Sequence, residues 1–385
     1  MTESTNNSKL DFDSILPYGE KIRPLIASSF LTENDLKKLL AQKGIFISST
    51  HKKHTVPLLA TCLLSPDEFE FLRSRQRIKE NNKKIITREV AWESDCTLFD
   101  ALKKEQIPFS DFMPRRSTNY HLSSKRNKFT YVEDKDELIL EYTIDRDNPT
   151  RDWSTNKSRH EGKVILKRDE EKKKLKMIME YTAVETKELN DHIIKHIVKV
   201  GKQNNYIRRD DTMKKILFGE FSNKERVEFL LSLHSEDPYD IFSFKEITNV
   251  EISLDTSKVL PEDIKWMENK VRNLILKGEK LHDAVFLTEP KYHDCLIIAS
   301  IEAVYDFSSF ASKGSCTIEY GFLSRSHLPD GNSEFEFKIT KLNFESNKPK
   351  KKVEGFLLSK FELYKTHKYE LIKPQSKPKP KKYQA

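Results

Sequence analysis

Lysine and arginine side chains gather in three stretches of this chain, and cations at that density can contact the phosphates of a nucleic acid. The first stretch spans residues 73–88 and is predicted to be rich in turns. The second spans residues 115–128 and holds no acidic residue. The third surrounds Tyr206, on which a base could stack, and its cations are Lys202, Arg208 and Arg209. In the first two stretches, the candidate phosphate contacts are Arg73, Arg75, Arg77, Arg115, Arg116, Lys125 and Arg126. A solvated charged surface gives the same pattern, so that alternative stays open.

A second kind of chemistry is indicated by Glu185-Thr186-Lys187, which lies at the end of a predicted strand. Nucleases of the PD-(D/E)xK class place an acid on one strand and a Glu-x-Lys at the end of its hairpin partner, where they hold a divalent metal and a water. The preceding hairpin arm ends at Asp169, but Asp136 or Asp145, on an earlier predicted strand, is better placed to complete such a set. This alternative makes Asp145, Glu185 and Lys187 catalytic and Mg²⁺ the cofactor. Glu-x-Lys also occurs by chance in a chain with 33% charged residues.

Composition limits the remaining possibilities. The 385 residues carry a net charge of +8, a mild excess that suits a polyanion partner without requiring one. The four cysteines have no CxxC spacing, which argues against a disulfide framework or a cysteine zinc site and favours the cytoplasm. No apolar run is long enough to cross a membrane. The sequence lacks GxxxxGK[ST], GxGxxG, GxSxG and HExxH patterns, which disfavours ATP-driven, dinucleotide-dependent, α/β-hydrolase and zincin chemistry.

Helix signals are clearest near the N-terminus. Thr32 and Asp35 form a capping-box pattern before a leucine-rich helix, and Gly44 follows where that helix should end. A second helix is expected over residues 56–64, with Pro57 in its first turn. Ser65 then begins a third helix.

Residues 31–64 resemble a SAP motif, the helix–extension–helix module that binds DNA. The positions that carry the resemblance are Leu36, Leu39, Leu40, Gly44, Ile45, Lys52, Lys53 and Leu59. The resemblance implies contacts to the DNA backbone from the start of the second helix, where free N–H groups and lysines face phosphates. It therefore adds Lys43, Lys52 and Lys53 to the candidate phosphate contacts. The sequence departs from the pattern in its short turn, which lacks the usual glycine, and in Pro57.

Beyond residue 112 the pattern changes to alternating strands separated by charged turns. Strands are expected near 128–145, 162–168, 175–186, 242–254, 284–288, 295–307, 316–323 and 335–344. Helices are expected over 189–200, closed by Gly201, and over 224–233, 261–276 and 353–364.

These patterns predict an α+β protein, with an N-terminal helical module and then one or two mixed domains with largely antiparallel sheets. The expected divisions are a polar tail (1–14), a helical basic module (15–112), two α+β domains (113–210 and 211–368) and a basic, proline-rich tail (369–385). The leading hypothesis is a non-enzymatic, cofactor-free DNA-binding protein of the cytoplasm. It would be an accessory or sensor subunit of a bacterial defence or mobile-element complex. The metal-dependent nuclease and a protein–protein interaction scaffold are the alternatives.

Overall fold

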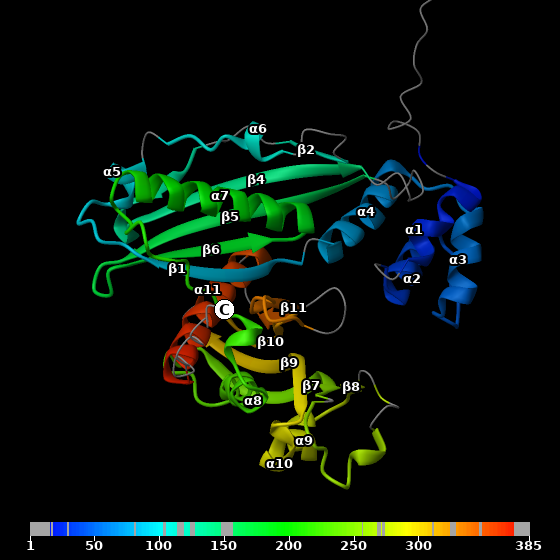
Figure 1. Cartoon of the computed structure of the whole chain (residues 1–385). Helices are drawn as coiled ribbons and strands as arrows, with labels where there is room; N and C mark the ends of the chain where they lie inside the picture. Colours follow the sequence, from blue (N-terminus) through cyan, green and yellow to red (C-terminus); the bar gives the residue numbers. More distant parts are fainter. Residues whose placement is uncertain are drawn as a thin grey trace, which may run out of the picture.

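The fold is that of a computed structural model, in which α-helices precede one large antiparallel sheet (Figure 1). It describes residues 16, 18–28, 31–80, 82–102, 105–113, 119–123, 128–147, 157–255, 257–267, 271, 274–309, 312–323, 329–345 and 349–372. The predicted tail 1–14 lies outside these residues. Of the predicted tail 369–385, only residues 369–372 are described. The α+β fold class predicted from the sequence is confirmed.

Four helices form the N-terminal part: α1 (Arg23–Ala27), α2 (Glu33–Gln42), α3 (Lys52–Thr61) and α4 (Pro66–Glu80). The predicted capping box is present, because Thr32 and Asp35 exchange hydrogen bonds at the start of α2. Gly44 takes a positive φ of 74° just past α2, as predicted. The leucines of α2 pack against α3 in a small core that includes Leu36, Leu39, Leu40, Val56 and Leu59.

Two predictions for this region are wrong. Helix α3 begins at Lys52, so Pro57 lies inside the helix and not in its first turn. Burial of Val56 and Leu59 outweighs the one backbone hydrogen bond that the proline removes. The basic stretch 73–88 is not a turn-rich segment, since α4 continues to Glu80 and strand β1 follows almost at once.

The sheet has eleven strands, and every pairing between them is antiparallel. Across the sheet the order is β2 (Tyr120–Leu122), β4 (Glu137–Asp147), β5 (Lys157–Asp169), β6 (Lys174–Tyr181), β1 (Lys84–Ala91), β11 (Glu336–Glu345), β10 (Ser312–Gly321), β9 (Leu296–Ser309), β7 (Phe242–Leu254) and β8 (Leu274–Lys277). Strand β3 (Thr130–Val132) pairs with β4 at one edge.

Long helices cover the two halves of this sheet. Helix α7 (Val184–Gln203) lies over the first half of the sheet, in front of β5 in Figure 1, and shares a core with β4, β5, β6 and β1. Helices α8 (Asn223–Ser232) and α11 (Lys350–Ile372) share the other large core with the second half. Ile86 packs in the α7 core and its neighbour Ile85 in the α11 core. Successive strand residues point to opposite faces, so α7 and α11 cover opposite faces at β1.

The same supersecondary unit occurs twice. In each half a meander of three long strands is followed by a long helix, as β4–β5–β6–α7 and as β9–β10–β11–α11. The shorter elements are helices α5 (Leu98–Leu102), α6 (Phe109–Phe112), α9 (Val285–Thr288) and α10 (Pro290–His293), and 3₁₀ turns at Gly19–Lys21, Glu133–Lys135, Phe218–Glu220, Lys265–Met267 and Leu281–Asp283.

The two halves meet over a very short stretch of backbone pairing. Strand β1 pairs with β6 along its whole length but with β11 only at Lys84↔Lys338 and Ile85↔Phe337. Beyond that point the segment 212–217 lies between them, bridging Glu89 to Lys214 and Leu217 to Glu334. We call this region the joint. Side-chain contacts must add to the stability of the joint, because β1 and β11 pair directly at only two positions.

Other predicted elements differ from the structure. The stretch 261–276 holds a 3₁₀ turn and strand β8 and not a long helix, and 284–288 is helical and not a strand. Helix α7 continues past Gly201, which is buried inside the helix. A Cβ at that position would lie 2.6 Å from the side chain of Ile207, so the glycine permits close packing and does not end the helix.

Candidate nucleic-acid interface

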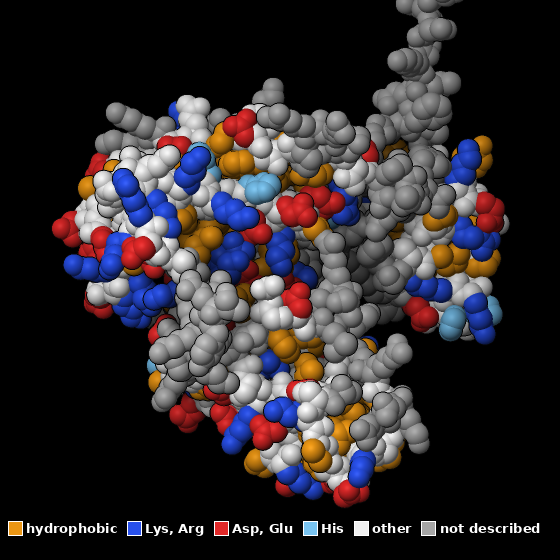
Figure 2. All heavy atoms as spheres, in the orientation of Figure 1, with side chains coloured by type: hydrophobic (Ala, Val, Ile, Leu, Met, Phe, Trp, Pro, Cys, Tyr) orange, Lys and Arg blue, Asp and Glu red, His pale blue; other side chains and the backbone are white. Residues whose placement is uncertain are grey.

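The outer surface of α7 carries a row of lysines. The helix is amphipathic, with Ile193, Ile194 and Ile197 buried against the sheet. Lys195, Lys199 and Lys202 are spaced i, i+4 and i+7, which places them on one side of the helix. Figure 2 shows lysine and arginine side chains gathered over the left part of α7.

A shallow groove of about 420 Å³ lies at this row, which we call the α7 groove. Its lining consists of Lys195, Val198, Lys199, Lys202, Gln203 and Arg209, so it contains four cations and no carboxylate. The ammonium group of Lys202 donates to the backbone oxygens of Arg209, at 3.1 Å, and Asp211, at 2.6 Å. These bonds draw the loop after α7, and with it Arg209, back towards the helix.

The cations of the α7 groove differ in how they are engaged. Lys202 already donates hydrogen bonds to two backbone carbonyl groups. Within the described part of the chain, Lys195, Lys199 and Arg209 make no ion pair with a carboxylate. Arg208, which the sequence placed in the same group, pairs with Glu93 at 3.6 Å and Asp210 at 3.4 Å. The groove therefore presents uncompensated positive charge to a polyanion.

Tyr206 was expected to offer a ring face on which a base could stack, but another aromatic ring already covers a face of it. Its ring stacks on that of Trp92, with centroids 5.4 Å apart and planes inclined by 26°. The contact holds the loop after α7 against the first half of the sheet. The α7 groove thus offers flexible ammonium and guanidinium groups, which suit phosphate contacts better than base recognition.

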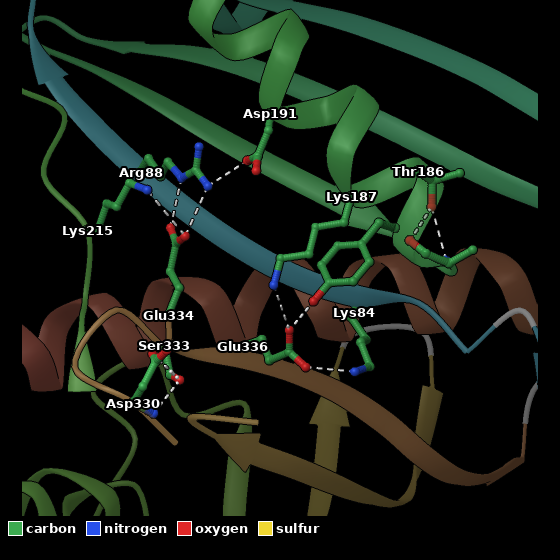
Figure 3. A network of polar contacts seen from close by, with 12 residues as sticks. Lys84, Arg88, Thr186, Lys187, Asp191, Lys215, Asp330, Ser333, Glu334 and Glu336 are labelled. Carbon is green, nitrogen blue, oxygen red and sulfur yellow. Dashed lines mark hydrogen bonds and ion pairs between the residues drawn. The ribbon is translucent and has the colours of Figure 1, made fainter. Parts of the chain in front are cut away.

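A second charged cluster lies at the joint and is drawn in Figure 3. Arg88 of β1 makes two hydrogen bonds to Glu334, from Nε at 2.8 Å and from Nη2 at 3.0 Å, and a third to Asp191 of α7 at 2.6 Å. Lys215 lies 3.7 Å from the same glutamate. Burial lowers the pKa of Arg88, but Glu334 and Asp191 outweigh it and leave this pKa raised. Arg88 is therefore a permanently charged link between β1, α7 and the start of β11.

Glu336 forms the other half of this cluster. It accepts hydrogen bonds from the Tyr181 hydroxyl and from Lys84 Nζ at 2.7 Å, and Lys187 Nζ lies 3.7 Å away. Burial, and then the charge of Glu336, raises the pKa of Tyr181 well above its usual value, so the phenol remains a donor. Figure 3 shows Glu334, just before β11, reaching towards Arg88 and Lys215, and Glu336 of β11 reaching towards Lys84 and Lys187. We call the eight side chains the joint network: Lys84, Arg88, Tyr181, Lys187, Asp191, Lys215, Glu334 and Glu336.

The structure does not bring together the three residues of the nuclease alternative. Asp145 pairs with Arg159 at 2.7 Å, on the sheet face opposite α7. Glu185 lies in the first turn of α7 and not at a strand end, and it pairs with Arg146 at 3.3 Å on the α7 face. Lys187 belongs to the joint network. Among the described residues, no group of three His, Cys, Asp or Glu side chains is placed to hold a metal ion.

Two of the candidate phosphate contacts in the N-terminal helices have structural partners. Lys43 donates to the Leu63 carbonyl at 2.6 Å and to Glu68 at 2.8 Å, which ties α2 to the start of α4. Lys52 donates to the Ser28 carbonyl at 2.5 Å. These lysines are therefore committed to contacts inside the helical domain, whereas Lys53 is exposed at the start of α3.

The remaining candidates are divided between α4 and undescribed segments. Arg75 pairs with Asp35 at 3.2 Å and lies over the Phe71 ring. Arg73 is half-buried, and the side chain of Arg77 is outside the described part of α4. The other candidates lie in segments that the structure does not describe: Arg115, Arg116, Lys125 and Arg126. Within the described residues, no helix has the length and apolar character needed to cross a membrane.

Sequence reasoning missed Lys195 and Lys199, although a signal was present. Three lysines at i, i+4 and i+7 on a helix whose other side is apolar indicate a basic row at the surface. The joint network had no such signal, because Arg88 and Glu334 are separated by 246 positions in the chain.

Comparison with known proteins bears on the N-terminal helices. Residues 20–82 match the family model described as the GAPS4b protein N-terminal domain, a domain of a bacterial defence-system protein. This match overturns the resemblance to a SAP motif, which fell within the same residues. The structure agrees, because Pro57 is inside α3 and Lys52 is bonded within the domain.

No curated protein and no solved structure matches the chain. Over its N-terminal helices, the chain is similar to the N-terminal domain of a bacterial anti-phage defence protein.

Proposed function

We propose that this chain is a non-enzymatic DNA-binding subunit of a bacterial anti-phage defence complex. The observation that carries the proposal is the α7 groove, where four cations line one surface and no carboxylate does. Phosphate groups would supply the negative charge that the lining of the groove lacks. Their contact with these cations would release counterions condensed on the nucleic acid, and this release is the main source of sequence-independent affinity. The family match of residues 20–82 supports the defence context.

The geometry favours contacts to the phosphate backbone over contacts to bases. Lys195 and Lys202 are seven residues apart, which is about 10 Å along a helix axis. Such spacing allows neighbouring cations to reach successive phosphates of one strand. The exposed Lys53 of α3 would add a contact from the N-terminal domain. Neither set of residues distinguishes one base sequence from another.

Fluorescence anisotropy with a labelled DNA duplex tests the proposal at low salt. The Lys195→Glu/Lys199→Glu variant should weaken binding by at least about tenfold, because two attractive contacts become repulsive. The matched control is Lys224→Glu/Lys258→Glu, which makes the same change of charge at two exposed lysines, one in α8 and one in the loop after β7. Absence of binding by the unmodified protein at low salt, or equal losses in both variants, would overturn the proposal.

A protein partner is the second candidate, and one surface favours it. The insertion between β7 and β9 exposes large apolar side chains, with Val259 96% exposed and Trp266 63% exposed. Exposed tryptophan is enriched among residues that dominate protein interfaces. The Trp266→Ser variant should keep the melting temperature of the free protein. In pull-downs it should lose any protein that co-purifies with the unmodified chain. Retention of every such protein by the variant would remove this candidate.

A further inference from the structure

A cavity of about 310 Å³ lies at the joint, between β1, the segment 212–217 and the last turns of α11. This side of the sheet is opposite the face that carries α7. Its walls include the apolar side chains of Met213, Ile216 and Leu217 and the ring of Tyr369. The volume is at the lower end of the range for cavities that hold small ligands. We call it the α11 cavity.

The inner wall of the α11 cavity is electropositive. Lys365, only 3% exposed, lies 2.9 Å from Glu362, and Lys176 of β6 lies 3.0 Å from the same carboxylate. The buried ammonium group of Lys365 and the half-buried one of Lys176 thus share one carboxylate. Burial lowers the pKa of Lys365 more than the charge of Glu362 raises it. Lys176, Glu362 and Lys365 together carry a net charge of +1 when all three are ionised, which an added carboxylate would balance.

The mouth of the same cavity is acidic. Glu220 and Glu370 are exposed and line the opening together with the exposed Lys214, and Glu370 also lies 3.7 Å from Lys174. Glu89 lies deeper, where it pairs with Lys174 at 3.1 Å. A ligand entering the cavity therefore passes exposed carboxylates before it reaches Lys365. This order of charges would repel a dianion such as a phosphate monoester at the mouth.

We propose that the α11 cavity binds a free α-amino acid with an apolar side chain. The carboxylate of the ligand faces Lys365, and its ammonium group lies between Glu220 and Glu370 at the mouth. The apolar side chain packs against Met213, Leu217 and Tyr369. A zwitterion satisfies both ends of the cavity with no net charge, whereas an amine or an acid alone satisfies only one.

The position of the α11 cavity gives the ligand a structural effect. Its walls come from β1 in one half of the sheet and from α11 in the other, with the segment 212–217 between them. A bound amino acid therefore contacts both halves where backbone pairing is shortest. Because the ligand binds only the folded protein, it should raise the melting temperature as its concentration rises.

Isothermal titration calorimetry and thermal melting of the full chain test this inference with L-leucine, L-methionine and L-phenylalanine. At least one should bind with a stoichiometry of one and raise the melting temperature. The matched probes are isoamylamine and 4-methylpentanoate, which are leucine without its carboxylate and without its amine. Each should bind at least about tenfold more weakly, through loss of a charge-assisted contact. No binding by any of the three amino acids, or equal binding by the amine, would overturn the inference.

Variants separate the two ends of the site. Glu220→Gln/Glu370→Gln removes charge at the exposed mouth and should weaken leucine binding by about tenfold without unfolding the protein. Glutamine at 220 can still accept the backbone hydrogen bond from Leu217. The control Glu228→Gln/Glu236→Gln makes the same change at two exposed glutamates elsewhere and should bind leucine normally. Equal affinity in the two variants would contradict the assignment of the mouth. The proposed DNA binding depends on the α7 groove, and the proposed amino-acid binding depends on the α11 cavity. Each can therefore fail in its own assay without the other.

Discussion

Arg88 and Glu334 form a two-bonded ion pair that connects β1 to the start of β11, with Nε–Oε1 at 2.8 Å and Nη2–Oε2 at 3.0 Å. Both side chains are buried. Backbone pairing between the two strands is limited to two residue pairs, so this contact is a major link between the halves of the sheet. Arg88→Met leaves Glu334 and Asp191 without their buried partner and should lower the free energy of unfolding by about 3 kcal/mol.

Urea denaturation measures this loss, and Arg159→Met is the control. Arg159 makes a similar pair with Asp145, but its side chain is 61% exposed. Water screens that pair, and its loss should change stability by less than about 1 kcal/mol. Equal losses in the two variants would show that the joint does not depend on Arg88.

The α7 groove leads to a prediction about salt. In a plot of log affinity against log salt concentration, each phosphate neutralised on duplex DNA contributes about 0.9 to the magnitude of the slope. The Lys195→Gln/Lys199→Gln variant should therefore have a slope smaller by about 2. Titrations with a labelled duplex at several salt concentrations measure it. Lys202→Gln offers a contrast, because its ammonium group already donates to two carbonyls and its loss should also loosen the loop. An unchanged slope in the double variant would place the phosphates elsewhere.

Local signals in the sequence predicted most elements, and tertiary contacts decided the exceptions. The boundaries of β7, Phe242–Leu254, agree with the prediction because the alternating pattern is long and ends at polar residues. Pro57 and Pro261 were both expected to begin helices. The first lies inside α3, and the second precedes only a short 3₁₀ turn. Proline fixes its own φ, but it does not decide whether the following residues bury an apolar face.

The candidate functional residues also differ in whether the sequence alone could reveal them. The row of lysines on α7 follows from helical spacing and could be found from the sequence alone. The joint network depends on contacts between β1, α7 and β11, which are far apart in the chain. Asp145 and Glu185 show the converse, since two residues that the nuclease alternative needs close together lie on opposite faces of the sheet.

Gly162 gives a prediction about packing in the first half of the sheet. It lies opposite Tyr142 in the β4–β5 ladder, and a Cβ there would lie 2.3 Å from the tyrosine ring. That ring is buried, and its hydroxyl lies 2.9 Å from two acceptors on α7, the Asn190 side-chain oxygen and the Thr186 carbonyl, which share its one proton. Gly162→Ala should therefore cost about 2 kcal/mol of stability by displacing Tyr142.

Gly355→Ala is the matched control for that substitution. Gly355 lies on the exposed side of α11, and a Cβ there would meet nothing within 4 Å. Alanine in a helix is favoured over glycine, so this variant should gain about 1 kcal/mol. Chemical denaturation of both variants measures the difference. A loss at Gly355 as large as that at Gly162 would contradict the packing argument.

His234 gives a prediction about pH. Its ring lies 4.5 Å from that of Phe244, and its Nε2 bonds to the Tyr320 hydroxyl. Burial, and then the charge of His282, lowers the pKa of His234 from 6.5 to about 3. Below pH 6.5 the unfolded chain binds a proton here that the folded protein does not. This histidine therefore contributes stability that is present above pH 6.5 and is lost as pH falls towards 3.

His234→Gln isolates that contribution, because glutamine can keep a hydrogen bond to Tyr320 but cannot titrate. In the unmodified protein one extra proton binds on unfolding, and the free energy of unfolding should fall by up to about 1.4 kcal/mol per pH unit from this residue. Urea denaturation between pH 7 and pH 4.5 compares the two slopes, and the carboxylates contribute equally to both. The variant should lose less stability over this interval. Parallel curves would show that His234 is protonated in the folded protein as readily as in the unfolded chain.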